Sequence, residues 1–216
     1  MWTHGKVSTE LGCIQQADFR YSGKSTLVSV LLRILDLSSG TLMIDDINLQ
    51  TVPRETIRSR LITIPQDPFF LTGTVRLNMD PKKSLADKAI INALIKVDLW
   101  RTLETRGGLD ADMKDQPLSK GQQQLLCLAG AILKSSSRIL ILDEPTSNMD
   151  METDEQIHEI IRKEFSNHTS IIISHRLGNM MTCDKICVME DGYIVECGSP
   201  QELSSRSSKF KELMGV

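Results

Sequence analysis

The sequence feature that most constrains the fold is an apolar run that ends in two acidic residues. Residues 139–142 read ILIL, and Asp143 and Glu144 follow at once. An unbroken apolar run of this length is typical of a strand that is buried on both faces of a parallel sheet. Pro145 ends the strand. Taken alone, the run fits an ordinary buried strand with an acidic turn as well as it fits a functional site.

Two carboxylates at the end of such a strand suit magnesium and water chemistry. Asp143 can help to hold a Mg²⁺ ion that is bound mainly by phosphate oxygens and waters. Glu144 points in a different direction as the next residue, so it can orient or deprotonate an attacking water. The functional hypothesis therefore gives these neighbours separate roles.

A helix-opening motif lies upstream of this run. Residues 118–122 read LSKGQ and are followed by a helical pattern over residues 123–133. Ser119 is the predicted N-cap, and Gly121 lets a ligand approach the backbone. Free N–H groups and the positive end of the helix dipole favour a phosphate there. A surface helix with a routine cap is the alternative for this motif alone.

A second phosphate-binding pattern lies near the N-terminus, where residues 22–26 read SGKST. Gly23 permits close backbone approach, Lys24 reaches the β- and γ-phosphates of a nucleotide, and the hydroxyl of Ser25 can ligate Mg²⁺. The apolar residues 27–35 are predicted to form the helix whose N-terminus faces the phosphates. The tetrapeptide GKST at residues 23–26 can occur by chance, but its position before the acidic strand favours an ATP site.

Together these motifs resemble the nucleotide-binding domain of ABC transporters over about residues 23–202. In that family LSGGQ is the signature motif, with Lys120 here in place of its first Gly, and the acidic strand is the Walker B motif. The segment QDPFFLTGT at residues 66–74 is similar to the second, C-terminal cassette of C-subfamily transporters. The resemblance implies an α/β fold that is P-loop NTPase-like, with a mostly parallel sheet, flanking helices and a small helical subdomain.

The resemblance also implies a site for ATP and Mg²⁺. Its catalytic residues would be Glu144, His175 and Gln66, although a His or Gln at a strand end is more often structural. The ATP-binding residues would be Ser22, Gly23, Lys24, Ser25, Thr26, Gln66, Asp143, Ser119, Lys120, Gly121 and Gln122, and the metal ligands Ser25, Gln66 and Asp143.

The start of the chain departs from the family pattern. Five residues before Gly23 the pattern asks for Gly, but the chain has Asp18, whose charge has the sign of the phosphates. Trp2 is a poor candidate for the aromatic that stacks on adenine. We expect an atypical segment at residues 1–20, a largely missing N-terminal antiparallel subdomain, and a chain that is truncated or wrongly joined.

The expected domains after this segment are a cassette at residues 21–205, with a helical lobe at about 70–125, and a C-terminal helix at residues 206–216. Strands are predicted at residues 42–44, 61–64, 170–174, 185–189 and 193–196, the last two joined at Asp191-Gly192. Helices are predicted from Pro53 to Arg60 and at residues 84–100, 103–105 and 152–165.

The function implied is ATP hydrolysis that powers export of a small molecule. The partners would be a second cassette, paired head to tail, and the transmembrane domains of a transporter. The chain has no apolar run of about 20 residues and no signal peptide, so we expect it at the cytoplasmic face of a membrane. A net charge of -3 without a basic stripe disfavours nucleic acid as a partner.

Two alternatives stay open. One is a truncated, catalytically impaired cassette that acts only as a binding or regulatory module. The other is a soluble ABC ATPase that is not linked to transport. The chain has five cysteines, which we expect to be reduced core thiols. Zinc binding at Cys183 and Cys187 is disfavoured because no His lies at ligand spacing.

Overall fold

The structure is a computed structural model that describes residues 23–115, 117–134, 136–144, 149–174 and 180–215, and the backbone of residues 13–16. The chain divides into two compact units. The first, here called the sheet unit, contains residues 1–63, 137–147 and 167–216. The second, here called the helical unit, contains residues 64–136 and 148–166. Each unit is described by itself.

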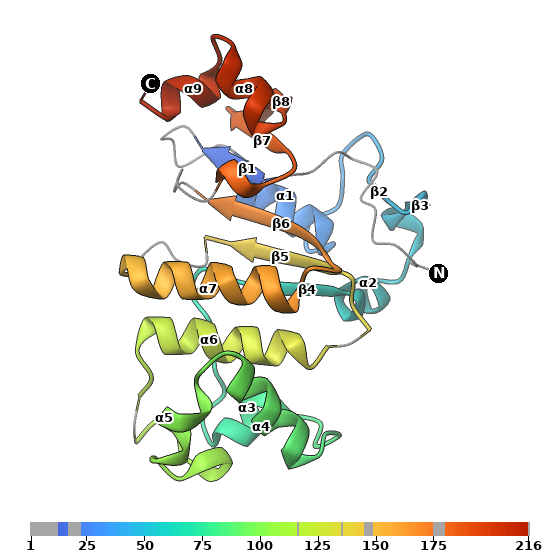
Figure 1. Ribbon diagram of the computed structural model, residues 1–216. Coiled ribbons are helices and arrows are strands. Elements are labelled where there is room, and N and C mark those ends of the chain that lie inside the picture. Colours follow the sequence, from blue (N-terminus) through green and yellow to red (C-terminus); the bar gives the residue numbers. More distant parts are fainter. Residues whose placement is uncertain are drawn as a thin grey trace. The chain divides into compact units, whose positions relative to one another are not determined.

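A six-stranded sheet with the order β4-β5-β6-β1-β7-β8 organises the sheet unit. Strands β5, β6, β1 and β7 are parallel to one another and lie side by side, while β8 is antiparallel to β7 (Figure 1). The strands are β1 (Cys13–Gln16), β4 (Leu61–Ile64), β5 (Ile139–Asp143), β6 (Thr169–Ser174), β7 (Ile186–Glu190) and β8 (Tyr193–Gly198). This is the predicted α/β fold with a mostly parallel sheet.

The acidic strand forms as predicted. Residues 139–142 of β5 are each at most 1% exposed, and Ile141 pairs with Ile171 of β6. The predictions for β4 and for the β7–β8 hairpin are also confirmed. Asp191 and Gly192 at the turn of that hairpin have φ values of 49° and 83°. Positive φ at both central residues is the requirement of the tight hairpin turn that an Asp-Gly pair predicts.

Strand β1 was not predicted from the sequence. Its residues read CIQQ, which shows neither an apolar run nor alternation. It lies between β6 and β7, and Ile14 is in register with both Ile173 and Cys187. Pairing along both edges therefore defines this strand, and such tertiary context is not visible in four residues of sequence.

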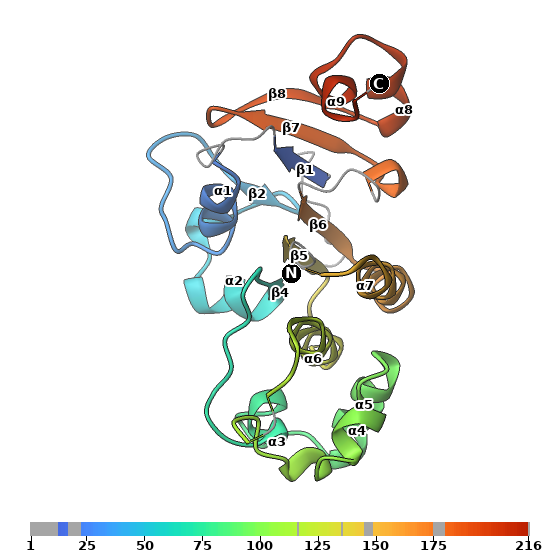
Figure 2. The same cartoon turned by 90° about the vertical axis from the view of Figure 1, so that its left-hand side faces the viewer.

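Helices α1 (Lys24–Leu31) and α2 (Arg54–Arg60) lie on the same side of the sheet (Figure 2). Alternate residues of the strands face them, because successive side chains of a strand point to opposite faces. The core on this side comprises Val28, Leu31, Leu42, Ile44, Leu49, Ile57, Leu61, Ile139, Ile141, Ile171, Ile173, Cys187 and Met189. Burial of this apolar surface holds α1 against the strands that carry the acidic residues.

A smaller core joins β7 to the end of the chain. Ile186 and Val188 pack with Leu203 of α8 (Pro200–Ser205) and Phe210 of α9 (Lys209–Leu213). We expected a C-terminal helix at residues 206–216, where the chain forms α9, but helix α8 before it was not predicted. The side chain of Ser208 accepts a hydrogen bond from the backbone N–H of Lys211, so α9 begins with its own capping residue.

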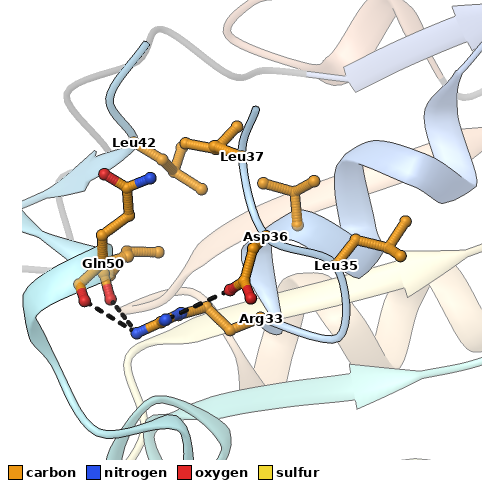
Figure 3. A pocket seen from close by; sticks show the side chains of 8 residues that line it. Arg33, Leu35, Asp36, Leu37, Leu42 and Gln50 are labelled. Carbon is orange, nitrogen blue, oxygen red and sulfur yellow. Dashed lines mark hydrogen bonds and ion pairs between the residues drawn. The ribbon is translucent and has the colours of Figure 1, made fainter. Parts of the chain in front are cut away.

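Helix α1 ends earlier than predicted, at Leu31 rather than at residue 35. Arg33 has a φ of 49°, which takes the chain out of the helix. Its Nη1 donates to the carbonyl oxygens of Leu49 (3.2 Å) and Gln50 (3.0 Å), and its Nη2 to Asp36 (3.3 Å) (Figure 3). The same Nη1 also donates to the carbonyl oxygen of Val52 (3.0 Å). The guanidinium thereby joins the loop after α1 to η1 (Leu49–Thr51).

The pocket beside Arg33 is lined by five apolar residues and three polar ones. Its lining consists of Val30, Arg33, Leu35, Asp36, Leu37, Leu42, Leu49 and Gln50 (Figure 3). None of the predicted site residues lines it. Between Leu42 and Leu49, β2 (Met43–Ile44) and β3 (Ile47–Asn48) form a separate two-stranded sheet. Asp45 and Asp46 have φ values of 48° and 61° at its turn, as their residue type predicts.

The helical unit contains α3 (Val75–Met79), α4 (Asp87–Lys96), α5 (Trp100–Glu104), η2 (Gly108–Asp110), α6 (Lys120–Ile132) and α7 (Met151–Glu164). The prediction of one helix over residues 84–100 is wrong. Helix α4 ends at Lys96, and Asp98 has a φ of 56°, which breaks the helix. Helix α7 confirms its prediction, and Ile157, Ile160 and Ile161 form its buried face.

The remaining expectations concern membranes and cysteines. No helix in the described part of the chain is long and apolar enough to cross a bilayer. The described residues bring together no cluster of three or more potential metal ligands. Cys183 is disulfide-bonded, so the expectation of reduced thiols is wrong for this residue.

Replacing Arg33 with Met tests its role in the sheet unit. Met keeps an apolar stem but leaves three backbone carbonyls without this donor. A single hydrogen bond from a charged group contributes about 1.5–3 kcal/mol. The three bonds share one nitrogen of a side chain that is 19% exposed, so we expect their joint loss to lower the free energy of unfolding by only about 2–3 kcal/mol. Urea unfolding measures it. Arg54→Met is the matched control: it removes only an exposed pair with Asp36 and should cost under about 1 kcal/mol. Equal losses would contradict the assignment.

Candidate functional site

The site in the sheet unit begins at the N-terminus of α1. Gly23 is the N-cap and has a φ of 85°, a left-handed conformation that favours glycine. A Cβ atom on Gly23 would lie 3.3 Å from the Cα of Gly192 in the β7–β8 turn. Lys24, the first residue of α1, has a side chain that is only 5% exposed. The glycine therefore lets the chain turn closely against the hairpin and bury the lysine.

The end of β5 supplies the acidic partners of Lys24. The Nζ atom of Lys24 lies 3.9 Å from Oε1 of Glu144. The backbone N–H of Glu144 donates to the carbonyl of Ile173 (2.9 Å), which ties the end of β5 to β6. Glu144 has a φ of 45°. Left-handed backbone is costly for a residue with a side chain, and such strain concentrates at functional sites.

Burial dominates the electrostatics of this group. It lowers the pKa of Lys24, although the nearby carboxylates of Glu144 and Asp143 act in the opposite direction. Burial also raises the pKa of Asp143, the negative charge of Glu144 raises it further, and Lys24 partly offsets both effects. For both Lys24 and Asp143, the loss of water on burial therefore outweighs the attraction between their opposite charges.

This arrangement fits a phosphate chain with a divalent cation. A buried ammonium at a helix N-terminus is a site for anions. Its positive charge adds to the free N–H groups and to the positive end of the helix dipole, which both favour a negative group there. Two carboxylates beside it would repel an anion alone, but they suit the metal that accompanies a nucleoside triphosphate. The residue types present therefore fit ATP with Mg²⁺, held by Lys24 and Asp143.

The structure brings part of the predicted set together in the sheet unit. Gly23, Lys24, Asp143 and Glu144 meet there, and Ser25 lies next to them in the first turn of α1 with an exposed side chain. Thr26 follows in the same turn and is also exposed. The predicted residues Ser22 and His175, and the departure at Asp18, lie outside the described residues.

The helical unit holds the rest of the predicted residues. Ser119 caps α6 as predicted: its Oγ accepts from the N–H of Gln122 (3.2 Å), and Gln122 Oε1 accepts from the N–H of Ser119 (3.1 Å). This reciprocal pair is a capping box. Lys120, which replaces a Gly of the family motif, forms an exposed ion pair with Asp67 at 2.9 Å.

Gln124 is a residue that the sequence analysis missed. Its side chain is buried, and its Nε2 donates to the carbonyls of Pro65 (2.9 Å) and Gln66 (3.0 Å). It therefore positions the backbone of predicted site residue Gln66. The sequence signal for this role was the spacing: Gln124 lies four residues before Leu128 and therefore on the apolar face of α6. A buried amide needs hydrogen-bond partners, so a glutamine on that face indicates a positioning role.

Gly121 has a packing role that the sequence did not reveal. A Cβ atom there would lie 2.8 Å from Cγ2 of Thr153, so a larger residue would require the Thr153 side chain or one of the two helices to shift. Thr153 is itself fixed, because its N–H and Oγ1 both donate to the carboxylate of Asp150 (2.9 and 3.0 Å). Close helix packing thus explains this glycine without any ligand.

Replacing Gly121 with Ala tests that explanation. The clash with Thr153 should lower the free energy of unfolding by about 1–3 kcal/mol, even though Ala favours a helix by about 1 kcal/mol over Gly. Thr153→Ser removes the clashing methyl group and keeps the hydroxyl. The double variant should recover the loss in urea unfolding. A stable Gly121→Ala variant, or a double variant with additive losses, would exclude the packing role.

Asp143→Asn tests the electrostatics through pH. Because the folded-state pKa of Asp143 is raised, its contribution to stability is present below the unfolded-state value of 3.8 and is lost as pH rises through the folded-state value. The neutral Asn should therefore raise Tm near neutral pH, and the difference should vanish in acid. Thermal unfolding across pH measures this.

Asp150→Asn is the matched control for that experiment. Hydrogen bonds from Thr153 lower the pKa of Asp150, so its contribution is present at neutral pH and lost in acid. This variant should lower Tm near neutral pH. The account is contradicted if Asp143→Asn also lowers it.

Comparison with known sequences agrees with the nucleotide site that the geometry indicates. A sequence model described as ABC transporter matches residues 22–147. ABC transporter atnG of Emericella nidulans is 45% identical over 193 residues, which are 89% of this chain and 12% of that protein. ABC multidrug transporter B of Aspergillus fumigatus is 44% identical over 193 residues, 89% of this chain and 13% of that protein.

A mammalian relative matches nearly the same share of the chain. ATP-binding cassette sub-family C member 2 of Rattus norvegicus is 41% identical over 201 residues, which are 88% of this chain and 12% of that protein. The chain thus spans about an eighth of the length of these curated relatives. The family match covers more than half of the chain and includes the buried lysine and both acidic residues. The chain is therefore an ATP-binding domain of the ABC transporter family.

Proposed function

We propose that this chain binds ATP with Mg²⁺ and hydrolyses it to power the export of a small molecule by a transporter. The observation that carries the proposal is the buried ammonium of Lys24, 3.9 Å from Glu144 and at the N-terminus of α1. A buried cation is costly unless anionic groups offset it. The β- and γ-phosphates would add the negative charge that this position favours.

The acidic residues would divide the remaining work. ATP with Mg²⁺ supplies the phosphate chain and the cation that offsets its charge. Asp143 and the hydroxyl of Ser25 would hold the metal, and Glu144 would orient the attacking water and accept its proton. By family resemblance, Gln66 would contact the metal or the water, and His175 the γ-phosphate.

We further propose that the chain is the second, C-terminal cassette of a C-subfamily transporter. The segment QDPFFLTGT and the 41% identity to the rat sub-family C protein support this. A second cassette would pair with it head to tail, so that the Ser119–Gln122 segment of each cassette serves the ATP held by the other.

Transmembrane domains would be the other partners, at the cytoplasmic face of a membrane. Phe69 is 85% exposed and Leu71 is 43% exposed in the loop that follows Gln66. Two exposed apolar side chains in one loop favour contact with another protein surface. The names of the relatives describe transporters, which is consistent with such partners.

Glu144→Gln tests the catalytic proposal. Gln keeps the size of the side chain but cannot accept the proton of water. ATP hydrolysis by the purified chain with Mg²⁺ should fall by about 10²–10⁴-fold, the usual contribution of a general base, while ATP affinity by calorimetry should remain. Glu159→Gln is the matched control, because Glu159 is an exposed acidic residue of α7.

The outcome separates the proposal from its alternative. Hydrolysis that is equal in wild type and Glu144→Gln would remove Glu144 from the catalytic role. Binding without hydrolysis in the wild type would favour a cassette that acts only as a binding or regulatory module. Absence of binding at millimolar ATP would contradict the nucleotide site itself.

A further inference from the structure

Two cysteines face each other across the β7–β8 hairpin. Cys187 of β7 and Cys197 of β8 are in register as directly opposite residues of an antiparallel pair. Both are thiols, and their Sγ atoms lie 2.6 Å apart. This separation is shorter than van der Waals contact between two sulfur atoms, and a disulfide bond is about 2.05 Å long. The two sulfurs therefore need only a small shift to become bonded.

The backbone geometry of the hairpin also suits a disulfide. Opposite residues of antiparallel strands have Cα atoms about 4.5–5.5 Å apart. Natural disulfides join Cα atoms that are about 4.4–6.8 Å apart. A bond between Cys187 and Cys197 can thus close without moving either strand.

The two thiols differ in their access to solvent. Cys187 is completely buried and belongs to the core that packs against α1. Cys197 is exposed on β8, the edge strand of the sheet. Because thiol–disulfide exchange requires the attacked disulfide to reach the thiolate, an external reagent reaches Cys197 first. Cys187 can react only with a group that is already attached to its neighbour.

We propose that Cys187 and Cys197 are a modification site that forms a reversible cross-strand disulfide with glutathione disulfide as oxidant. The thiolate of Cys197 attacks one sulfur of glutathione disulfide, breaks its S–S bond and releases one glutathione. The thiolate of Cys187 then attacks Sγ of Cys197 and releases the second glutathione. Two cysteine thiols lose two electrons in total, and one glutathione disulfide gains them and becomes two glutathione thiols.

The bond would fix the hairpin that packs against the start of α1. The turn of this hairpin contains Gly192, whose Cα would lie 3.3 Å from a Cβ atom on Gly23. The bond joins residues ten positions apart. Closing such a loop stabilises a protein mainly by restricting its unfolded state. The oxidised chain should therefore unfold at a higher temperature.

The test treats the purified chain with glutathione disulfide, blocks remaining thiols and digests it with trypsin. Both cysteines fall in the peptide Ile186–Arg206, which has no internal Lys or Arg. The oxidised peptide should lose the mass of two hydrogen atoms and take up no blocking reagent. Tm should rise by about 5 °C, and dithiothreitol should restore the original mass and both reactive thiols of this peptide.

Single variants separate the two chemical steps. Cys187→Ser should stop at a glutathione adduct on Cys197, whereas Cys197→Ser should leave Cys187 unmodified. Cys127→Ser is the matched control and should behave as wild type, because burial raises the pKa of Cys127 to about 11 and keeps it unreactive. A wild-type chain that retains glutathione on Cys197, or that links Cys197 to the peptide containing Cys183, overturns the proposal.

Discussion

The ammonium group of Lys24 lies buried beside the carboxylates at the end of β5, and the candidate site depends on this interaction. Three parts of the sheet unit produce it. The core under α1 holds the helix against the sheet, the left-handed Gly23 turns the chain into that helix, and the bond from Glu144 to Ile173 fixes the end of β5. A cation in this position is poorly compensated by water, so it favours an anionic ligand.

The same region concentrates features that oppose stability. Glu144 has a positive φ, burial raises the pKa of Asp143, and burial lowers the pKa of Lys24. A chain selected for stability alone would replace these residues with apolar ones. Elsewhere in the sheet unit, strand β7 and the core under α1 bury their apolar residues in the ordinary way. This contrast supports the assignment of the region as a ligand site.

Elements with a strong local pattern could be predicted, whereas those defined by distant partners could not. The apolar run of β5, the Asp191-Gly192 turn and the amphipathic α7 follow directly from residue order. Strand β1 needs β6 and β7 to define it, and the end of α4 depends on the left-handed backbone of Asp98. Sequence motifs predicted three of the site residues, namely Lys24, Asp143 and Glu144. The partners of Gln124 could not be predicted, because they are carbonyls 58 and 59 positions away.

The central claim is that Lys24, Asp143 and Glu144 of the sheet unit hold the phosphates and the metal of ATP. The most direct measurement is a crystal structure of the chain with Mg²⁺ and a non-hydrolysable ATP analogue. We predict that Nζ of Lys24 contacts the terminal phosphate and that Asp143 lies beside the metal. Nucleotide bound elsewhere, with Lys24 still paired to Glu144, would contradict it.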